Sequence, residues 1–298
     1  MYKIIQKRKI WFVFSGILMA ISIFGLAFYN LSFGIDFTGG TLMKIEFTDE
    51  RPSTTAVEES ISDIIDVTAQ PVDQKEMSLR MKDIPNDIRK QILDRLNEKF
   101  NKVDELSFES IGPSIGKELR QKAILAIIIV LMAIILYITW AFRKVSYGPV
   151  SSWVYGTAAV IALIHDILIV TGLFAFLSYF AHLEIDSLFV TALLTILGFS
   201  VHDTIVVFDR IREVLRLSSD KDFETVINES INQTIIRSLN TSLTALFVLT
   251  ILYLFGGESI KYFVLALIVG IITGTYSSIY IASPLLLVWE KIKQKRNI

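Results

Sequence analysis

Six long apolar runs dominate the pattern of hydrophobic and polar positions along the chain. A helix needs about 20 residues to cross the hydrocarbon core of a bilayer, and in lipid every backbone polar group must be hydrogen-bonded within its own element. The runs therefore predict six transmembrane helices, at residues 10–30, 121–142, 151–178, 187–208, 236–256 and 260–288. Apolar side chains along one face of residues 222–236 predict an amphipathic helix on the cytoplasmic membrane surface before the fifth span.

Residues 41–111 follow shorter patterns that are typical of a folded domain rather than of membrane spans. Alternating apolar and polar positions predict strands, and apolar stripes at helical spacing predict helices between them. We expect strands at 41–47, 67–72, 77–81 and 106–111, and helices at 53–65 and 85–100. This βαββαβ order predicts a ferredoxin-like domain. The segment has no histidine and no catalytic arrangement, which favours a binding or moving module over an enzyme domain.

The predicted fold is therefore an α-helical polytopic membrane protein with a small α+β domain between its first two helices. The first helix lies in residues 1–33, the domain in 34–120, and the other five helices in 121–298. Lys and Arg in short loops favour the cytoplasm, and they gather before the first span and after the second, fourth and sixth, at Lys3, Lys7, Arg8, Lys9, Arg143, Lys144, Arg210, Arg212, Arg216, Lys221, Lys291, Lys293, Lys295 and Arg296. This distribution predicts cytoplasmic termini and an extracytoplasmic domain. The first span lacks a convincing cleavage site and is expected to be an uncleaved signal-anchor.

Composition excludes several classes of function. The chain is 52% hydrophobic and 20% charged, with a formal net charge of −1 and no basic stripe that could neutralise nucleic-acid phosphates. It contains no cysteine, which excludes disulfides, thiol nucleophiles and cysteine-ligated metals. The spacing of the histidines and aspartates does not support a metal site, and we expect no cofactor.

Ionisable and polar side chains inside the spans are the candidate functional groups, because they are costly in lipid. On the fourth span, Ser200, Asp203 and Thr204 share one helical face, with His202 beside them. The fifth span begins with Arg237, and Asn240, Thr241 and Thr244 continue a polar stripe. We expect a contact between Asp203 and Arg237 that changes when a proton binds. Alternatively, Asp203 is purely structural and Arg237 extends to the lipid headgroups.

The third and sixth spans carry further polar or small residues. His165 and Asp166 lie about halfway along the third span and either take part in function or only fix helix packing. Small residues recur every four positions on the sixth span, which predicts a ridge for close helix contact, at Ala266, Gly270, Gly274, Ser278 and Ala282.

Several segments resemble the SecF family of the RND superfamily. The clearest are residues 34–40, with Gly34, Asp36, Gly39 and Gly40, and residues 198–213 of the fourth span. Further segments match in the same order, at 163–166, 234–241, 254–257 and 274–278. His202 departs from the family pattern, in which an asparagine is expected, and this puts the hydrogen bonding next to Asp203 in doubt.

The resemblance implies a function in protein export across the bacterial inner membrane. A SecF chain pairs with SecD as one of two six-helix halves and assists SecYEG in moving preproteins, driven by the proton motive force. YajC, YidC and membrane lipid are further expected partners. Asp203 and Arg237 would form the proton relay, supported by Ser200, His202, Thr204, Asn240, Thr241, His165 and Asp166. Glycine freedom at 34–40 would provide a pivot for the domain. Half of an RND-class small-molecule or lipid exporter and a passive scaffold that stabilises other Sec components remain alternatives; in none of these is the chain an enzyme.

Overall fold

This computed structural model describes residues 2–143, 149–217 and 221–296. The chain divides into two compact units. One comprises the residues up to Ser32 and those from Leu125 onward, and we call it the membrane unit. The other comprises Phe33–Ile124, and we call it the sheet unit. The predicted cytoplasmic marker Lys144 lies outside the described residues.

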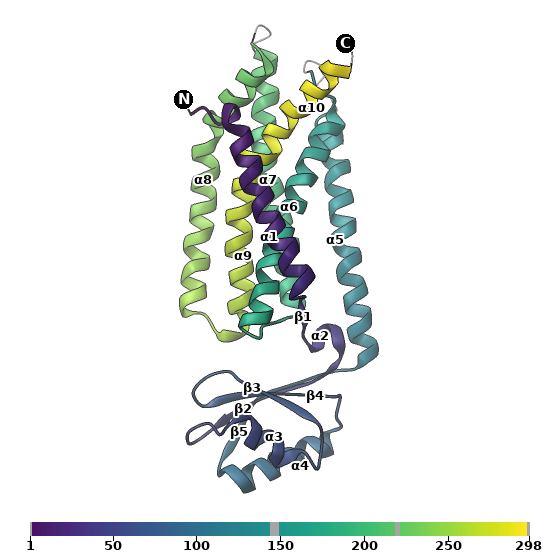
Figure 1. The fold of residues 1–298 in the computed structure, drawn as a ribbon, viewed down its shortest axis with the longest axis vertical. Coiled ribbons are helices and arrows are strands. Elements are labelled where there is room, and N and C mark those ends of the chain that lie inside the picture. The colour runs from purple at the N-terminus through teal and green to yellow at the C-terminus, as the bar shows by residue number, and fades with distance from the viewer. Residues whose placement is uncertain (1, 144–148, 218–220, 297–298) are drawn as a thin grey trace. The chain divides into compact units, whose positions relative to one another are not determined.

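Long helices make up the membrane unit (Figure 1). Six stretches among the described residues are long and apolar enough to cross a membrane, which confirms the six predicted spans. They are formed by α1 (Arg8–Phe28) after a 3₁₀ turn η1 (Ile5–Lys7), α5 (Pro113–Ala141), α6 (Ser152–Phe180), α7 (Ser187–Leu217), α8 (Phe223–Phe255), and α9 (Glu258–Ser277) continued by a π-helical turn η2 (Ser278–Ala282) and α10 (Ser283–Arg296). The first residues of α5 belong to the sheet unit.

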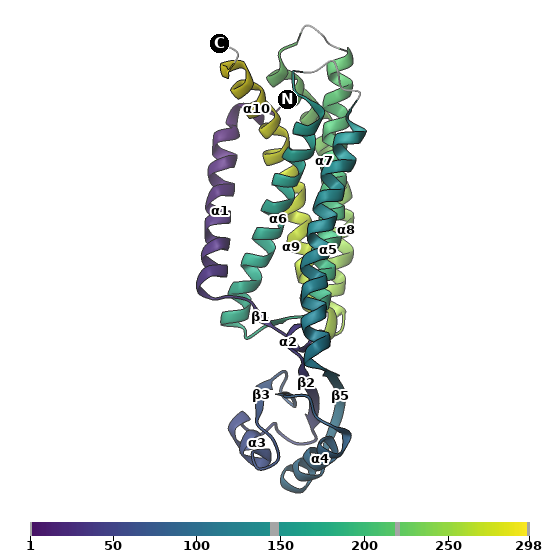
Figure 2. The same cartoon turned by 90° about the vertical axis from the view of Figure 1, so that its right-hand side faces the viewer.

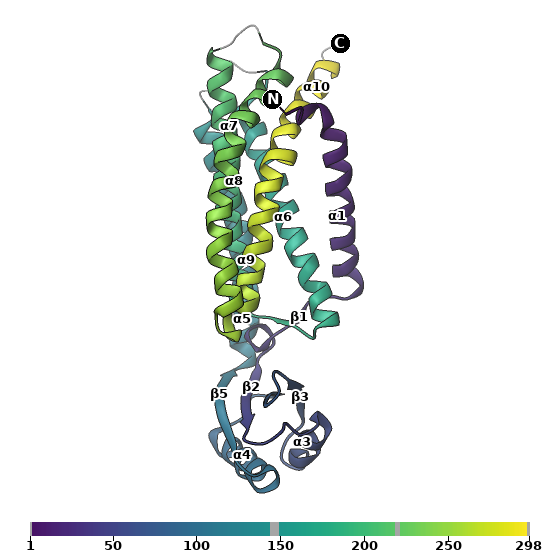
Figure 3. The ribbon, with the colours of Figure 1, turned by 90° about the vertical axis from the view of Figure 1, so that its left-hand side faces the viewer.

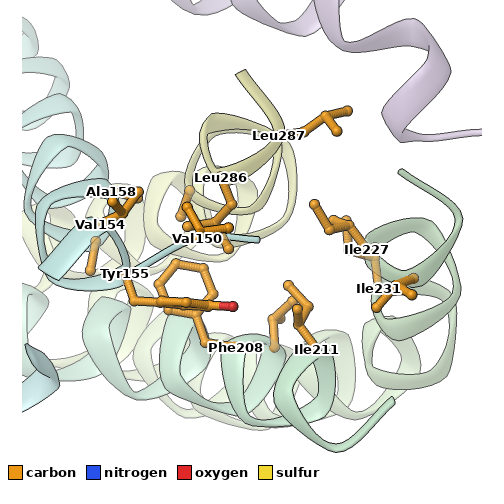
Figure 4. Close-up of a cluster of buried hydrophobic side chains, with 14 of the residues drawn as sticks. Val150, Val154, Tyr155, Ala158, Phe208, Ile211, Ile227, Ile231, Leu286 and Leu287 are labelled. Atoms are coloured by element: carbon orange, nitrogen blue, oxygen red, sulfur yellow. The ribbon is translucent and has the colours of Figure 1, made fainter. Parts of the chain in front are cut away.

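Close helix contacts bring polar side chains together inside the membrane unit. α9 packs against α6, α7 and α8, and α1 packs against α6. Figure 3 shows α8 and α9 side by side along their length. At the contact between α1 and α6, a Cβ added to Gly172 would lie 2.5 Å from the Cα of Ser22, so only glycine permits this approach. An apolar cluster between the first turns of α6 and α10 and the second half of α7 includes Tyr155, Leu286 and Phe208 (Figure 4).

The predicted separate surface helix at residues 222–236 is wrong. Helix α8 runs without interruption from Phe223 to Phe255, because no glycine or proline breaks it. Asp222 caps its first turn by accepting a hydrogen bond from the backbone N–H of Thr225 at 3.2 Å. The apolar face of this segment is buried in protein, with Ile227 and Ile231 directed towards Ile211 of α7 (Figure 4). A one-sided apolar stripe does not distinguish a helix that faces lipid from one that faces protein.

The sheet unit has the predicted ferredoxin-like fold. Its elements are β2 (Gly40–Phe47), α3 (Thr54–Ile61), β3 (Val67–Pro71), β4 (Glu76–Met81), α4 (Asn86–Phe100) and β5 (Val103–Ile111). The strands form one antiparallel sheet in the order β3-β4-β2-β5, and both helices lie on the same face of it (Figure 2). Alternate residues of β2, namely Met43, Ile45 and Phe47, are buried with Ile92 and Leu96 of α4. Helix α3 ends at Ile61 rather than near residue 65, and β5 begins three residues before its predicted start.

Candidate functional site

Asp166 lies at the centre of a buried polar cluster formed by three helices of the membrane unit. Its side chain on α6 is 0% exposed. It accepts hydrogen bonds from Ser200 Oγ of α7 at 2.7 Å and from Ser277 Oγ of α9 at 2.8 Å. His165 Nδ1 lies 3.0 Å from the other carboxylate oxygen. Two serine hydroxyls thus donate to this buried carboxyl group, so the side chain joins α6 to α7 and α9.

His165 extends the cluster towards α1. Its ring is 2% exposed, and Nε2 is buried without a hydrogen-bond partner among the described residues. The ring stacks on Tyr276 of α9, with 6.1 Å between the ring centroids. The Tyr276 hydroxyl lies 3.0 Å from Ser15 Oγ and 3.2 Å from the backbone oxygen of Trp11, both on α1. The cluster around Asp166 therefore includes side chains from four helices.

Asp203 is a second buried carboxylate, on α7. It is 5% exposed and accepts a hydrogen bond from Ser278 Oγ at 3.3 Å. Ser238 of α8 lies beside the same carboxylate, and its hydroxyl has no hydrogen-bond partner in the part of the chain that the structure describes. Thr204 donates instead to the backbone oxygen of Ser200. Ser200, Asp203 and Thr204 thus share one helical face but form hydrogen bonds with different partners.

The structure does not bring Arg237 to Asp203, contrary to the predicted contact. Arg237 is exposed on α8, as are Asn240 and Thr241, and within the described ranges no hydrogen bond or ion pair joins Arg237 to Asp203. The reason is helical geometry, since adjacent residues point in directions about 100° apart. The neighbouring Ser238 is the residue that faces Asp203. His202 is also exposed.

The small residues of the sixth span lie against α7 of the same chain. A Cβ added to Gly270 would lie 2.2 Å from the Ile196 side chain, and one added to Gly274 would lie 2.8 Å from Ser200 Cβ. These glycines let α9 approach α7 closely enough for Ser277 to share Asp166 with Ser200. Ser278, predicted as a packing residue, is in addition a hydrogen-bond donor to Asp203.

Residues 34–40 form a packed turn within the sheet unit. Gly34 precedes the short helix α2 (Ile35–Thr38), in which Asp36 is half-buried. Gly39 has φ +73° and Gly40 has φ +126°, which L side chains rarely adopt. A Cβ on Gly39 would lie 2.6 Å from the Cα of Pro113. Glycine is therefore required at position 39, because two segments of the chain cross closely there. This close packing argues against free rotation of the backbone at residues 34–40.

The sequence pattern missed two of the serines that lie beside the carboxylates. Ser277 and Ser238 lie inside segments that resemble the family, 274–278 and 234–241, but neither residue stood out because serine is common in packed membrane helices. Within the described ranges, no three His, Asp or Glu side chains come together to hold a metal ion. The arrangement offers two buried carboxylates that can each bind or release one proton.

Several known proteins resemble this chain in both sequence and fold. Residues 91–292 match the family described as protein export membrane protein SecD/SecF, C-terminal, and residues 24–50 match the SecD/SecF GG motif. The chain is 43% identical to the protein translocase subunit SecF of Thermobaculum terrenum, with 97% of this chain and 94% of the relative covered. The corresponding subunit of Anaerolinea thermophila is 40% identical, with the same shares covered.

A solved structure also resembles this chain. The crystal structure of SecDF from Thermus thermophilus, described as a translocon-associated membrane protein, matches with a TM-score of 0.84 and 31% identity. The match covers 97% of this chain but only 39% of the SecDF chain.

Proposed function

Since this chain belongs to the SecF family of protein translocase subunits, we propose that it pairs with a SecD chain and uses the proton gradient to assist preprotein export through SecYEG. It is a multi-pass membrane protein. The charge distribution supports cytoplasmic termini and an extracytoplasmic sheet unit in the bacterial inner membrane. The matching SecDF chain contains more than this chain supplies, and a separate SecD would supply the remainder.

The buried carboxylates support proton coupling. A proton that moves down a potential of 100 mV releases about 2.3 kcal/mol, and a group inside the membrane must bind and release it. Asp203 and Asp166 are ionisable side chains buried within the spans. Carboxylates at such positions are costly and are by default associated with ion pathways. Asp203 is the proposed relay residue, and Asp166, His165, Ser200 and Thr204 support it from the same bundle.

An uncovered polar face on α8 supports the SecD partner. Arg237, Asn240, Thr241 and Thr244 are exposed along a span that is apolar enough to cross a membrane. A polar stripe of this kind is disfavoured against lipid chains and normally faces protein or a water-filled cavity. We place SecD against this stripe, so that Arg237 acts across the contact between the two chains and not within this one.

The test of the proposed function is gradient-dependent export with an Asp203→Asn variant. Asparagine keeps the shape and hydrogen bonding of the side chain but cannot bind and release a proton. We expect the variant to assemble with SecD and to lose gradient-dependent stimulation of preprotein release from membrane vesicles. Arg237→Ala is expected to give a milder loss.

The matched control is Asp209→Asn on the same helix. Asp209 is an exposed residue paired with Arg212 at 2.7 Å, so its removal is expected to leave the stimulation intact. Near-normal stimulation in Asp203→Asn would contradict proton coupling through this residue and favour a passive scaffold for other Sec components.

A further inference from the structure

Two consecutive serines connect the buried carboxylates of Asp166 and Asp203. Ser277 is the last residue of α9 and donates to Asp166 of α6, whereas Ser278 is the first residue of η2 and donates to Asp203 of α7. Adjacent residues on a helix point in different directions, so this one position along the chain contacts both carboxylates. Asp166 and Asp203 are therefore joined through a single peptide unit.

Each of these hydroxyls also lies near a second acceptor. Ser277 Oγ is 3.2 Å from the backbone oxygen of Gly274, and Ser278 Oγ is 3.0 Å from that of Thr275. A serine hydroxyl has one proton to donate, so it donates either to the carboxylate or to the backbone. An ionised carboxylate only accepts hydrogen bonds, whereas the protonated acid also donates one. The direction of each hydroxyl therefore depends on the protonation of its carboxylate.

The backbone at this position is already irregular. The π-helical turn begins at Ser278, and its backbone oxygen accepts a hydrogen bond from Ser283 Oγ at 3.0 Å. Single π-helical turns inside α-helices occur frequently at functional sites. A change in the hydrogen bonds of Ser277 or Ser278 therefore acts on the part of the sixth span where the regular backbone ladder is interrupted.

From these contacts we infer that Asp166 is a second proton-binding carboxylate, and that Ser277 and Ser278 couple its protonation to that of Asp203. Each carboxylate takes one proton from water to become the neutral acid and returns it to water. The other titratable groups nearby are His165 and Tyr276 beside Asp166 and His202 beside Asp203. No Lys or Arg forms an ion pair with either carboxylate in the described part of the chain. This inference rests on the proposed proton-driven function and deepens it.

The test is infrared difference spectroscopy of the purified full-length protein as a function of pH. The C=O stretch of a protonated carboxyl group reports each site directly. We expect one titrating band that is lost in Asp166→Asn and a second that is lost in Asp203→Asn. In Asp203→Asn the midpoint of the Asp166 band is expected to move by about one pH unit, the size at which two sites titrate as a coupled pair.

Serine variants separate coupling from mere proximity. The double variant Ser277→Ala/Ser278→Ala is expected to keep both bands and to reduce the shift that Asp203→Asn causes. The matched control is Ser230→Ala, since Ser230 is a fully buried serine of α8 that, within the described ranges, donates to the backbone oxygen of Val226 and to no carboxylate. If Asp166→Asn does not fold, Asp166→Glu serves in its place, and its band is expected to change frequency and not to disappear.

Two results would overturn the inference. One is the absence of any band that depends on residue 166, and the other is an Asp166 midpoint that is the same with and without Asp203. If both bands titrate as a coupled pair but Asp203→Asn exports normally under a gradient, the proposed function fails and the coupled pair stands. If Asp203→Asn abolishes the gradient effect and Asp166 shows no band, the proposed function stands and this inference fails.

Discussion

The membrane unit buries carboxylates between its helices, whereas the sheet unit keeps its ionisable side chains on the surface. Among the described residues, Asp166, Asp203 and Glu290 are buried in the membrane unit, and the buried polar residues of the sheet unit are the neutral Thr41 and Ser60. The charged groups of the sheet unit pair near solvent, as Arg95 does with Asp63 at 3.1 Å. Such exposed pairs typically contribute less than about 1 kcal/mol to stability.

This contrast follows from the surroundings of each unit. Lipid cannot hydrogen-bond a polar group, so a membrane helix that carries a carboxylate must place it against donors from other helices. Water solvates the surface of the sheet unit, and its interior can be wholly apolar. The difference supports a division in which the membrane unit carries the proton chemistry and the sheet unit serves as a binding or moving element.

The largest expected effect tests whether the sheet unit has a core of its own. Leu96 of α4 is 0% exposed, and Leu96→Ala is expected to lower the free energy of unfolding by about 2–5 kcal/mol. The measurement is urea unfolding of a fragment containing residues 33–124. Leu106→Ala is the control, because Leu106 on β5 is 45% exposed. Equal effects of the two variants, or a fragment without a cooperative transition, would show that the unit depends on the rest of the chain.

A smaller loss of stability is expected when a glycine of the membrane unit, Gly172, is replaced by a larger residue. Gly172→Leu forces a side chain against the backbone of Ser22, with a Cβ only 2.5 Å from its Cα. Overpacking of this kind costs about 1–3 kcal/mol, so we expect a clear drop in the thermal midpoint of the purified protein in detergent. Gly198→Leu is the matched control, because nothing lies within 4 Å of its added Cβ. If Gly198→Leu lowers the thermal midpoint as much as Gly172→Leu does, the close approach of α1 to α6 is not the cause of the destabilisation.

The sequence predicted most of the fold because two strong constraints act on it. The bilayer demands long apolar helices, which revealed the six spans, and the alternation of Met43, Ile45 and Phe47 with polar residues revealed the buried face of β2. The continuity of α8 was missed, because the apolar stripe at Ile227 and Ile231 reads the same against lipid and against protein.

The candidate site was predicted only in part, since a single-helix pattern does not give the rotation of one helix against the next. Asp203 and Asp166 were identified as candidates because carboxylates inside spans are unusual. Ser200 and Ser278 were also among the candidates, but Ser277 and Ser238 were not, because their places beside the carboxylates depend on how α9 and α8 pack against α6 and α7. Arg237 was paired with Asp203 from the family resemblance and the polar pattern of the two spans, but it lies one residue, about 100°, around α8 from Ser238, on an exposed face.

The smallest expected effect concerns an exposed carboxylate of the membrane unit itself, in contrast to the buried Asp166. Asp222 is exposed and caps α8, and its side-chain hydrogen bond with Thr225 lowers its pKa below the ordinary aspartate value. The folded pKa is below the unfolded one, so the cap stabilises the protein at neutral pH, and this contribution is lost as pH falls through the folded pKa. Asp222→Ala is expected to cost about 1 kcal/mol at neutral pH. Asp222→Asn keeps an equivalent cap that does not titrate, so its thermal midpoint is expected to fall less on acidification than that of the unsubstituted protein. Identical pH profiles for these two proteins would assign the acid sensitivity to other carboxylates and remove Asp222 from the explanation.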